Sequence, residues 1–379
     1  MSTATGLVPL WNRAAEWDRR LAMIDRAQTF IYASTFYVEH DAYGIAFCAA
    51  LRAAARRGVS VHLLIDTFGQ RLGGLVMSRQ QRRALADEIA SLEREGVVVS
   101  WYRPTRKVQR LVGAGHHVKI QVTDDGEALF SSGNITRSSY EGWNEYAVAV
   151  RGPIARTLLE SYGQIGGTVA PQHLAMLPDV PGDIDIDYWF CDPNPLQGAG
   201  GPFAWRGRNS VTDRLVAMLD DARTSIRLTS FYFKPTPLLM DAVVRAARRG
   251  VQVEVFHSHR EALATTDLAW IASAASYDLL LGAGVEIYEN RHGEHSKIVL
   301  VDDRRVSFGS YNFEDAAHDR LAEAMLTSSD PRAVEPARAI FDELRQHADN
   351  ERVTIETFRS LPDRVRTRVA RYGRFKRWM

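Results

Sequence analysis

The sequence predicts an α/β protein of two similar domains, each a mixed, mostly parallel sheet flanked by helices, related by a pseudo-twofold axis. Three observations lead to this prediction. The chain has 379 residues, more than one ordinary core accommodates. A strand, helix and strand pattern occurs twice, at 26–66 and 221–259, and two further matched segments follow it, at 117–134 and 295–312.

The first repeat predicts a βαβ unit in each half. Residues 31–37 and 226–233 have the alternating or apolar pattern of strands, and each is followed by an Ala-rich and Val-rich helix that ends in "ARRG". The glycines of these sequences, Gly58 and Gly250, stand where a left-handed helix cap belongs. The β-branched runs "VSVHLLI" and "VQVEVF" come directly after them, so the two strands of each unit should be parallel.

Each half continues in the same order. A second helical stretch spans 78–96 or 268–284, and a strand follows it, "VVVSWY" or "VEIYE". The region 165–209 between the halves is rich in Gly and Pro, apart from the predicted strand "IDIDYWF". We place the boundary near residue 182, which gives domains 1–182 and 183–379.

The composition is that of a soluble globular protein. Hydrophobic residues make up 45% and charged residues 25% of the chain, and the net charge of +1 provides no general attraction to nucleic acid or membrane. The sequence contains no secretory signal and no run of about 20 apolar residues that could span a membrane. The only cysteines, Cys48 and Cys191, have no metal-type spacing, so we expect a reducing, cytoplasmic setting.

The second repeat contains the chemistry-bearing residues. His117 and Lys119 are two residues apart, as are His295 and Lys297, so each pair should lie on one side of its strand. Each pair is followed by an acidic turn containing Asp124 or Asp302. A return strand then leads to a turn of small residues that ends in an asparagine, Asn134 or Asn312.

Two alternative readings of these pairs are a buried structural histidine and a metal site. Eleven histidines and five lysines in this chain would give roughly 0.15 His-x-Lys pairs by chance, and two occur, at matching places. A metal site is disfavoured because lysine is a poor ligand. His116 and His117 cannot act together as ligands, since adjacent strand residues face opposite sides.

Two histidines, two lysines and two asparagines in one cleft suit transfer at a phosphodiester. Ammonium and amide groups can hold the non-bridging oxygens. One imidazole can attack phosphorus while the other moves a proton. We expect Ser132 and Ser310 to contact the substrate, and Glu145 and Glu323 to orient the histidines. Asp124 and Asp302 are interpreted as turn or interface residues.

These segments resemble the signature of the phospholipase D superfamily, H-x-K-x4-D-x6-G-S-x-N, which occurs twice in its members. "HSKIVLVDDRRVSFGSYN" matches it fully, and "HVKIQVTDDGEALFSSGN" differs only in having Ser131-Ser132 for Gly-Ser. The chain looks most like bacterial cardiolipin synthases, as in "GNITRSSYEGWNEYAVAVRGP" and "LLLGAGVEIYE". It departs from them in lacking an N-terminal pair of membrane helices. It also has "LAEAM", with Ala322 near the position of an expected asparagine.

The resemblance implies a phosphatidyltransferase with a phosphohistidine intermediate on His117 and with His295 as general acid and base, although the reverse order stays open. The same machinery with water as acceptor would be a phospholipase D. A superfamily nuclease is a second alternative, which the near-neutral charge disfavours, and a non-catalytic binding protein is a third. We expect no cofactor and no metal. The sequence leaves the donor, the acceptor and the oligomeric state open.

Two basic stretches could meet phospholipid. The tail 361–379 places Val365, Val369, Tyr372, Phe375 and Met379 at helical spacing among arginines, which is typical of an interfacial helix on an anionic membrane, or of a helix docked on the domain. The stretch 102–110 precedes the first motif, and its Arg106 and Lys107 could bind a head-group phosphate or be solvated. We therefore expect a cytoplasmic protein peripherally associated with the membrane.

Overall fold

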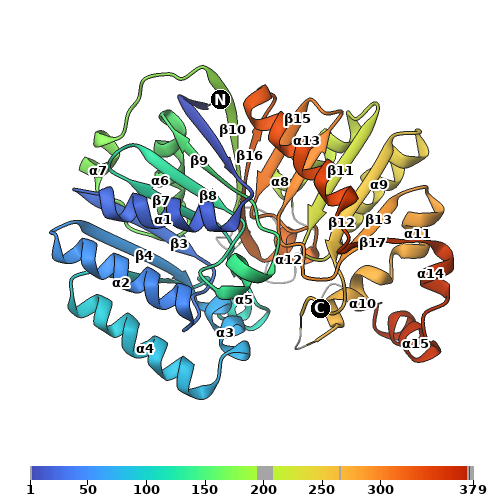
Figure 1. The fold of residues 1–379 in the computed structure, drawn as a ribbon, viewed down its shortest axis with the longest axis horizontal. Coiled ribbons are helices and arrows are strands. Elements are labelled where there is room, and N and C mark those ends of the chain that lie inside the picture. The colour runs from blue at the N-terminus through green and yellow to red at the C-terminus, as the bar shows by residue number, and fades with distance from the viewer. Residues whose placement is uncertain (1, 194–207, 264–265, 374, 376–379) are drawn as a thin grey trace.

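The computed structural model describes residues 2–193, 208–263, 266–373 and 375. Two mixed sheets lie side by side, each flanked by helices (Figure 1). The N-terminal half of the chain forms the left part of this view and the C-terminal half the right part. The prediction of two similar α/β domains is confirmed.

The N-terminal sheet has the strand order β2-β9-β8-β7-β3-β4-β5 within the described residues. The pairs β3–β4 and β4–β5 are parallel, and the pairs that involve β7, β8, β9 and β2 are antiparallel. Its strands are β2 Gly6–Leu10, β3 Phe30–Thr35, β4 Ser60–Asp66, β5 Val98–Tyr102, β7 Lys119–Thr123, β8 Glu127–Ser131 and β9 Ala147–Arg151.

The C-terminal sheet repeats this arrangement and extends it. Its order in the described chain is β1-β10-β16-β15-β14-β11-β12-β13-β17, and β6 pairs with β16 off this path. Its strands are β1 Ser2–Ala4, β6 Gly115–His116, β10 Ile184–Cys191, β11 Ser225–Ser230, β12 Gln252–Ser258, β13 Glu286–Asn290, β14 Ile298–Val301, β15 Arg305–Gly309, β16 Leu321–Ser328 and β17 Asn350–Val353.

The expectation of mostly parallel sheets is wrong. Parallel ladders are confined to the βαβ units and their next strand, β3–β4–β5 and β11–β12–β13, and to the short β6–β16 pair. Each His/Lys strand, β7 or β14, instead forms a tight hairpin with the strand after it. A hairpin connection of a few residues permits only antiparallel pairing, and this turns the other half of each sheet antiparallel.

The helices cover the outer faces of the sheets and the space between them (Figure 1). The predicted helix 78–96 is confirmed as α4, whereas 268–284 forms two short helices, α10 and α11. The helical elements are α1 Arg13–Arg26, α2 Ala42–Arg56, α3 Thr67–Val76, α4 Arg79–Arg94, α5 Lys107–Leu111, the π-helical turn η1 Ser138–Gly142, α6 Pro153–Gln164, α7 Pro171–Met176, α8 Ser210–Asp220, α9 Pro237–Arg248, α10 Leu268–Ala274, α11 Tyr277–Gly282, α12 Asp315–Asp319, α13 Pro331–Gln346, α14 Ile355–Arg359 and α15 Asp363–Tyr372.

The two βαβ units form as the sequence predicts. Helices α2 and α9 end at arginines, and the glycines that follow, Gly58 and Gly250, both have a φ of 88°, in the left-handed region. Glycine adopts this conformation without steric cost, so the chain can leave each helix and enter the next strand at once.

One hydrophobic core joins the two sheets. A single cluster of buried side chains includes Phe30 and Tyr32 of β3, Leu158 of α6, Phe256 of β12 and Phe341 of α13. Two other clusters lie under the helices on the far side of each sheet. Because the central cluster contains residues of both halves, the halves form one packed body with a fixed surface between them.

The chain also crosses between the halves. The boundary that we place near residue 182 falls between α7 and β10, yet β1 joins the C-terminal sheet by pairing with β10. Strand β6, from the N-terminal half, pairs with β16 of the C-terminal half.

The basic tail forms a helix that docks on the C-terminal domain. Val369 of α15 is buried in the core cluster under α10, and Val365 packs partly buried against the same cluster. Arg368 forms an ion pair with Asp267. Tyr372 and Phe375 are exposed, and Met379 lies outside the described residues. The predicted apolar face is therefore used in part inside the molecule, because it covers α10.

Asp124 and Asp302 act as turn residues. Asp302 accepts hydrogen bonds from the backbone N–H groups of Arg223, Thr224 and Ser225, just before β11. Asp124 does the same for Gln28 and Thr29 before β3. Each carboxylate thus links the hairpin turn after β7 or β14 by hydrogen bonds to the start of the neighbouring strand, β3 or β11.

Replacing Asp302 with alanine should lower stability without changing the site chemistry. Several N–H groups lose their acceptor, and water replaces it only in part, so we expect unfolding to become easier by about 1–2 kcal/mol. Thermal or urea unfolding would measure this change. Asp302→Asn keeps one acceptor oxygen and tolerates the positive φ of 54°, so it should lose less. A large loss of turnover per folded molecule in Asp302→Ala would show that Asp302 has a catalytic role.

Candidate active site

Backbone pairing across the domain interface assembles the site. In the N-terminal half, Gly115 N–H donates to the carbonyl of Arg320 and His117 N–H to the carbonyl of Ala322, at 3.0 and 2.8 Å. The histidine segment of the C-terminal half is paired in the same way with the N-terminal half. Asn144 N–H donates to the carbonyl of Gly293, and His295 N–H donates to the carbonyl of Asn144, both at 2.9 Å. Each histidine segment is therefore paired with the segment that contains the glutamate of the other half.

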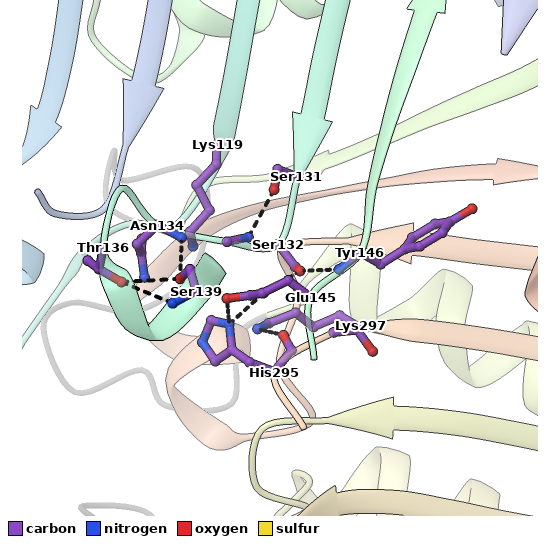
Figure 2. A network of polar contacts seen from close by, with 12 residues as sticks. Lys119, Ser131, Ser132, Asn134, Thr136, Ser139, Glu145, Tyr146, His295 and Lys297 are labelled. Carbon is purple, nitrogen blue, oxygen red and sulfur yellow. Dashed lines mark hydrogen bonds and ion pairs between the residues drawn. The ribbon is translucent and has the colours of Figure 1, made fainter. Parts of the chain in front are cut away.

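This pairing exchanges the predicted carboxylates between the halves. His295 lies beside Glu145, with its Nδ1 2.8 and 2.9 Å from the two carboxylate oxygens (Figure 2). The Nδ1 atom of His117 lies 3.3 Å from Oε1 of Glu323. Both glutamates are the ones expected from the sequence, but each orients the histidine of the other domain.

The two imidazoles face each other across the interface. Their ring centroids are 6.5 Å apart, and the side chains are 4% and 5% exposed. His117 Nδ1 also lies 2.9 Å from the carbonyl oxygen of Ser310. A carbonyl only accepts, so neutral His117 must carry its proton on Nδ1, which leaves the lone pair on Nε2.

Both predicted lysines are buried beside the histidines. Lys119 donates to the carbonyl of His117 at 2.8 Å, and Lys297 donates to the carbonyl of His295. Each is 2% exposed or less, and the charge of Lys297 disfavours the charged form of Lys119. Burial, followed by the other lysine, lowers the pKa of Lys119 well below its usual value, and burial lowers that of Lys297 to about 8. Two buried ammonium groups whose charges interact favour the binding of an anion beside them.

The asparagines lie in the same cluster, and the serines hold the carboxylates. The Oδ1 atoms of Asn134 and Asn312 are buried without a hydrogen-bond partner in the described chain. Ser132 donates to Glu145 at 2.5 Å, and Ser310 donates to Glu323. Each hydroxyl has one proton, so we revise the expected substrate contact of both serines to a positioning role.

Arg106 and Lys107 lie outside this cluster. Arg106 precedes α5 and is half-buried, and Lys107 is exposed at the first position of α5. In the described residues neither one contacts the catalytic histidines, lysines or glutamates. The same part of the chain contains no group of three His, Cys, Asp or Glu residues that could hold a metal ion.

Aromatic rings that our sequence analysis missed support both histidines. Phe36 meets the His117 ring edge-on at 4.8 Å, and Phe231 meets the His295 ring at 4.7 Å. Trp143 also stacks on His295 at 5.1 Å. Phe36 and Phe231 occupy matching places in "STFYV" and "TSFYF", so comparing the repeats would have found them.

The two His–Glu pairs differ in charge. Burial opposes the ionisation of Glu145, but His295 and then Lys297 outweigh it and hold its pKa at about 2. Burial lowers the pKa of His295 to about 4, with Glu145 acting in the opposite direction. Burial raises the pKa of Glu323 well above its usual value, despite Lys119, and lowers that of His117 well below 6.5. An ionised carboxylate, that of Glu145, thus faces His295. His117 instead faces a carbonyl oxygen and Glu323, whose burial favours the neutral carboxylic acid.

This arrangement has the parts for transfer at a phosphate. Paired buried cations suit the oxygens of an anion. A neutral imidazole with its Nε2 lone pair free can act as nucleophile, and an imidazole backed by a carboxylate can move a proton. Fold and site together define an enzyme of the phospholipase D superfamily, with one site shared by two domains.

The chain belongs to the family whose model is described as "Cardiolipin synthase, PLD-like domain", which matches residues 21–164 and 215–345. Cardiolipin synthase B of Salmonella typhi is 27% identical over 81% of this chain and 72% of its own. Cardiolipin synthase of Geobacillus kaustophilus is 26% identical over 83% of this chain and 61% of its own. The crystal structure of a Haemophilus influenzae phosphatidylserine synthase covers 99% of this chain and 95% of its own with a TM-score of 0.75 at 16% identity, and so shares the fold.

Among the helices of the described residues, none has both the length and the apolar character needed to cross a bilayer.

The charge difference predicts unequal effects of two matched substitutions. Glu145→Gln removes the negative charge beside His295, so protonated His295 becomes less favourable and its pKa falls further. We expect turnover of a phosphodiester to fall about 100-fold or more, with the alkaline limb of the pH profile moved to lower pH.

Glu323→Gln is the control for this experiment, because glutamine resembles the neutral acid that burial favours at this position. It should cost much less activity and leave the alkaline limb in place. Steady-state kinetics across pH would measure both variants. Equal losses in the two would contradict the charge difference.

Proposed function

We propose that the chain is a phosphatidyltransferase of the cardiolipin synthase type, which moves a phosphatidyl group through a phosphohistidine intermediate to an alcohol acceptor. The main observation is the reciprocal pairing of His117 with Glu323 and of His295 with Glu145, beside two buried lysines. The family match over both halves supports the lipid substrate.

In the first step, Nε2 of His117 attacks the phosphorus of the donor lipid. A P–N bond forms, and the bond from phosphorus to the oxygen of the head-group alcohol breaks. Protonated His295 donates its proton to that oxygen, so a neutral alcohol leaves. Lys119 and Lys297 hold the non-bridging oxygens as negative charge increases on them.

In the second step, the hydroxyl of the acceptor attacks phosphorus. His295 takes the hydroxyl proton, a P–O bond forms, and the P–N bond to His117 breaks. Water in place of the alcohol would give hydrolysis by the same route. The near-complete burial of both imidazoles limits the access of water to the intermediate.

The charges at the two histidines support this division of roles. His117 lies against the carbonyl of Ser310 and against Glu323, whose burial favours the neutral acid. These uncharged neighbours suit a neutral imidazole nucleophile. His295 lies against ionised Glu145, which stabilises the imidazolium that forms when it takes up a proton.

The proposed function can be tested by product analysis. The protein would be incubated separately with phosphatidylglycerol vesicles, phosphatidate and single-stranded DNA. We expect a new diacidic phospholipid and free glycerol from phosphatidylglycerol. Phosphatidate alone as product would make the protein a hydrolase, and DNA cleavage without a lipid product would overturn the proposal.

Two alanine variants should separate the roles of the histidines. A phosphatidyl ester with a p-nitrophenolate leaving group needs no proton to depart, so His295→Ala should still form the P–N bond. It cannot deprotonate the acceptor, and labelled phosphate should accumulate on His117 as an acid-labile, alkali-stable adduct. His117→Ala should form no adduct. Peptide mapping would locate the label, and the opposite pattern would exchange the two roles.

A further inference from the structure

Helix α3 buries its glycines and exposes its leucines. Its buried residues are Gly69, Gly73 and Gly74. A Cβ atom at Gly69 would overlap the carbonyl oxygen of Phe36, and one at Gly73 would overlap the ring of Tyr37. The helix therefore lies so close to the chain after β3 that only glycine can occupy this side.

The solvent-exposed part of α3 is mostly apolar. Leu72, Leu75 and Val76 are 41%, 76% and 50% exposed. Their spacing of three and four residues places them on one face of the helix. A helix of a globular protein normally turns its large apolar side chains toward the core, whereas α3 leaves these three exposed.

Helix α5 adds a further exposed apolar residue near α3, and the two segments carry only positive charge. The ring of Phe68 in α3 packs against Gly113, just after α5, and the two helices lie next to each other in Figure 1. Leu111 at the end of α5 is 86% exposed. Residues 67–77 and 103–111 contain no Asp or Glu, and they supply the basic residues Arg71, Arg103, Arg106, Lys107 and Arg110.

These basic side chains are not neutralised by the chain. In the part of the protein that the structure describes, none of the five forms an ion pair with Asp or Glu. Arg71, Arg103, Lys107 and Arg110 are exposed. Exposed leucines bordered by unpaired cations match the surface of a bilayer that contains anionic lipid, where apolar groups enter the acyl boundary and cations meet phosphates.

The surface is connected directly to the catalytic segment. The buried carboxylate of Asp66 accepts hydrogen bonds from Gly69 N–H at the start of α3, at 2.6 Å, and from His116 N–H, at 2.9 Å. Phe36, which lies under Gly69, contacts the His117 ring. One residue layer therefore separates α3 from the proposed nucleophile.

We propose that α3 and α5 form the surface that docks this enzyme on an anionic phospholipid bilayer. Leu72, Leu75, Val76 and Leu111 enter the interface, and the basic residues beside them contact lipid phosphates. Docking there brings the site to the level of the head groups. The proposal rests on the proposed function for the use of a membrane substrate, whereas the docking itself requires no turnover.

Vesicle binding by the full chain tests the proposal. Vesicles of phosphatidylcholine with and without phosphatidylglycerol would be used in a flotation or sedimentation assay. Leu75→Asp/Leu111→Asp should weaken binding to the anionic vesicles by about tenfold or more. Arg71→Glu/Lys107→Glu should weaken it to a similar extent, most strongly at low salt.

Leu238→Asp is the matched control, because Leu238 is 52% exposed on α9, in the other domain and away from α3 and α5 (Figure 1). It should bind vesicles as the unchanged protein does. All variants should keep their thermal unfolding temperature and their turnover of a dissolved phosphodiester such as bis(p-nitrophenyl) phosphate. Loss of vesicle binding with that activity intact would support the docking surface.

Three results would overturn the proposal. The first is unchanged vesicle binding by both double variants, and the second is no vesicle binding by the unchanged protein. The third is conversion of a dimer to a monomer with vesicle binding retained, which would assign this face to a second copy of the chain. Vesicle binding through α3 and α5 without any lipid product would leave the docking surface standing and refute the proposed function alone.

Discussion

The site depends on the pairing of each histidine segment with the backbone of the other half. Residues 115–117 are hydrogen-bonded to 320–322, and residues 293–295 to the segment around Asn144. These bonds set the register in which Glu323 meets His117 and Glu145 meets His295. Each His–Glu pair takes one residue from each half, so the site forms only where the two halves meet. The hydrophobic core shared by the two sheets stabilises this interface.

The buried cations are costly unless an anion lies between them. Lys119 and Lys297 are almost fully buried and have carbonyl oxygens as their hydrogen-bond acceptors in the described structure. Desolvation lowers the pKa of both ammonium groups, and repulsion from Lys297 lowers that of Lys119 further. A phosphate between them would offset both effects and would also favour protonation of a neighbouring imidazole. In the proposed mechanism, the charge of the substrate favours the protonated His295 that the first step requires.

The sequence predicts the parts of this structure that depend on local pattern. The periodicity of the apolar residues and Gly58 or Gly250 define each βαβ unit, and the spacing of the two motifs identifies both His/Lys pairs, both asparagines and both glutamates. It does not reveal which glutamate meets which histidine, because His295 and Glu145 are 150 residues apart in the chain, and His117 and Glu323 are still further apart. The return strand after each acidic turn is predicted, but the βαβ pattern alone does not show that this hairpin and the strands beyond it make most of each sheet antiparallel. Helix α3 was missed because its glycines weaken a helix pattern when the close approach of Phe36 is not known.

The two halves of the duplicated chain differ in charge beside the histidines. Glu314 follows Asn312 by two residues, at the place where the first half has Thr136, and it forms an ion pair with Lys234, the counterpart of Glu39. The charge of Glu314 adds to the burial that raises the pKa of Glu323. Thr136 is uncharged and does not oppose the ionisation of Glu145, whose pKa stays low beside His295. This charge difference beside the two motifs is the basis on which we propose His117 as the nucleophile and His295 as the proton carrier.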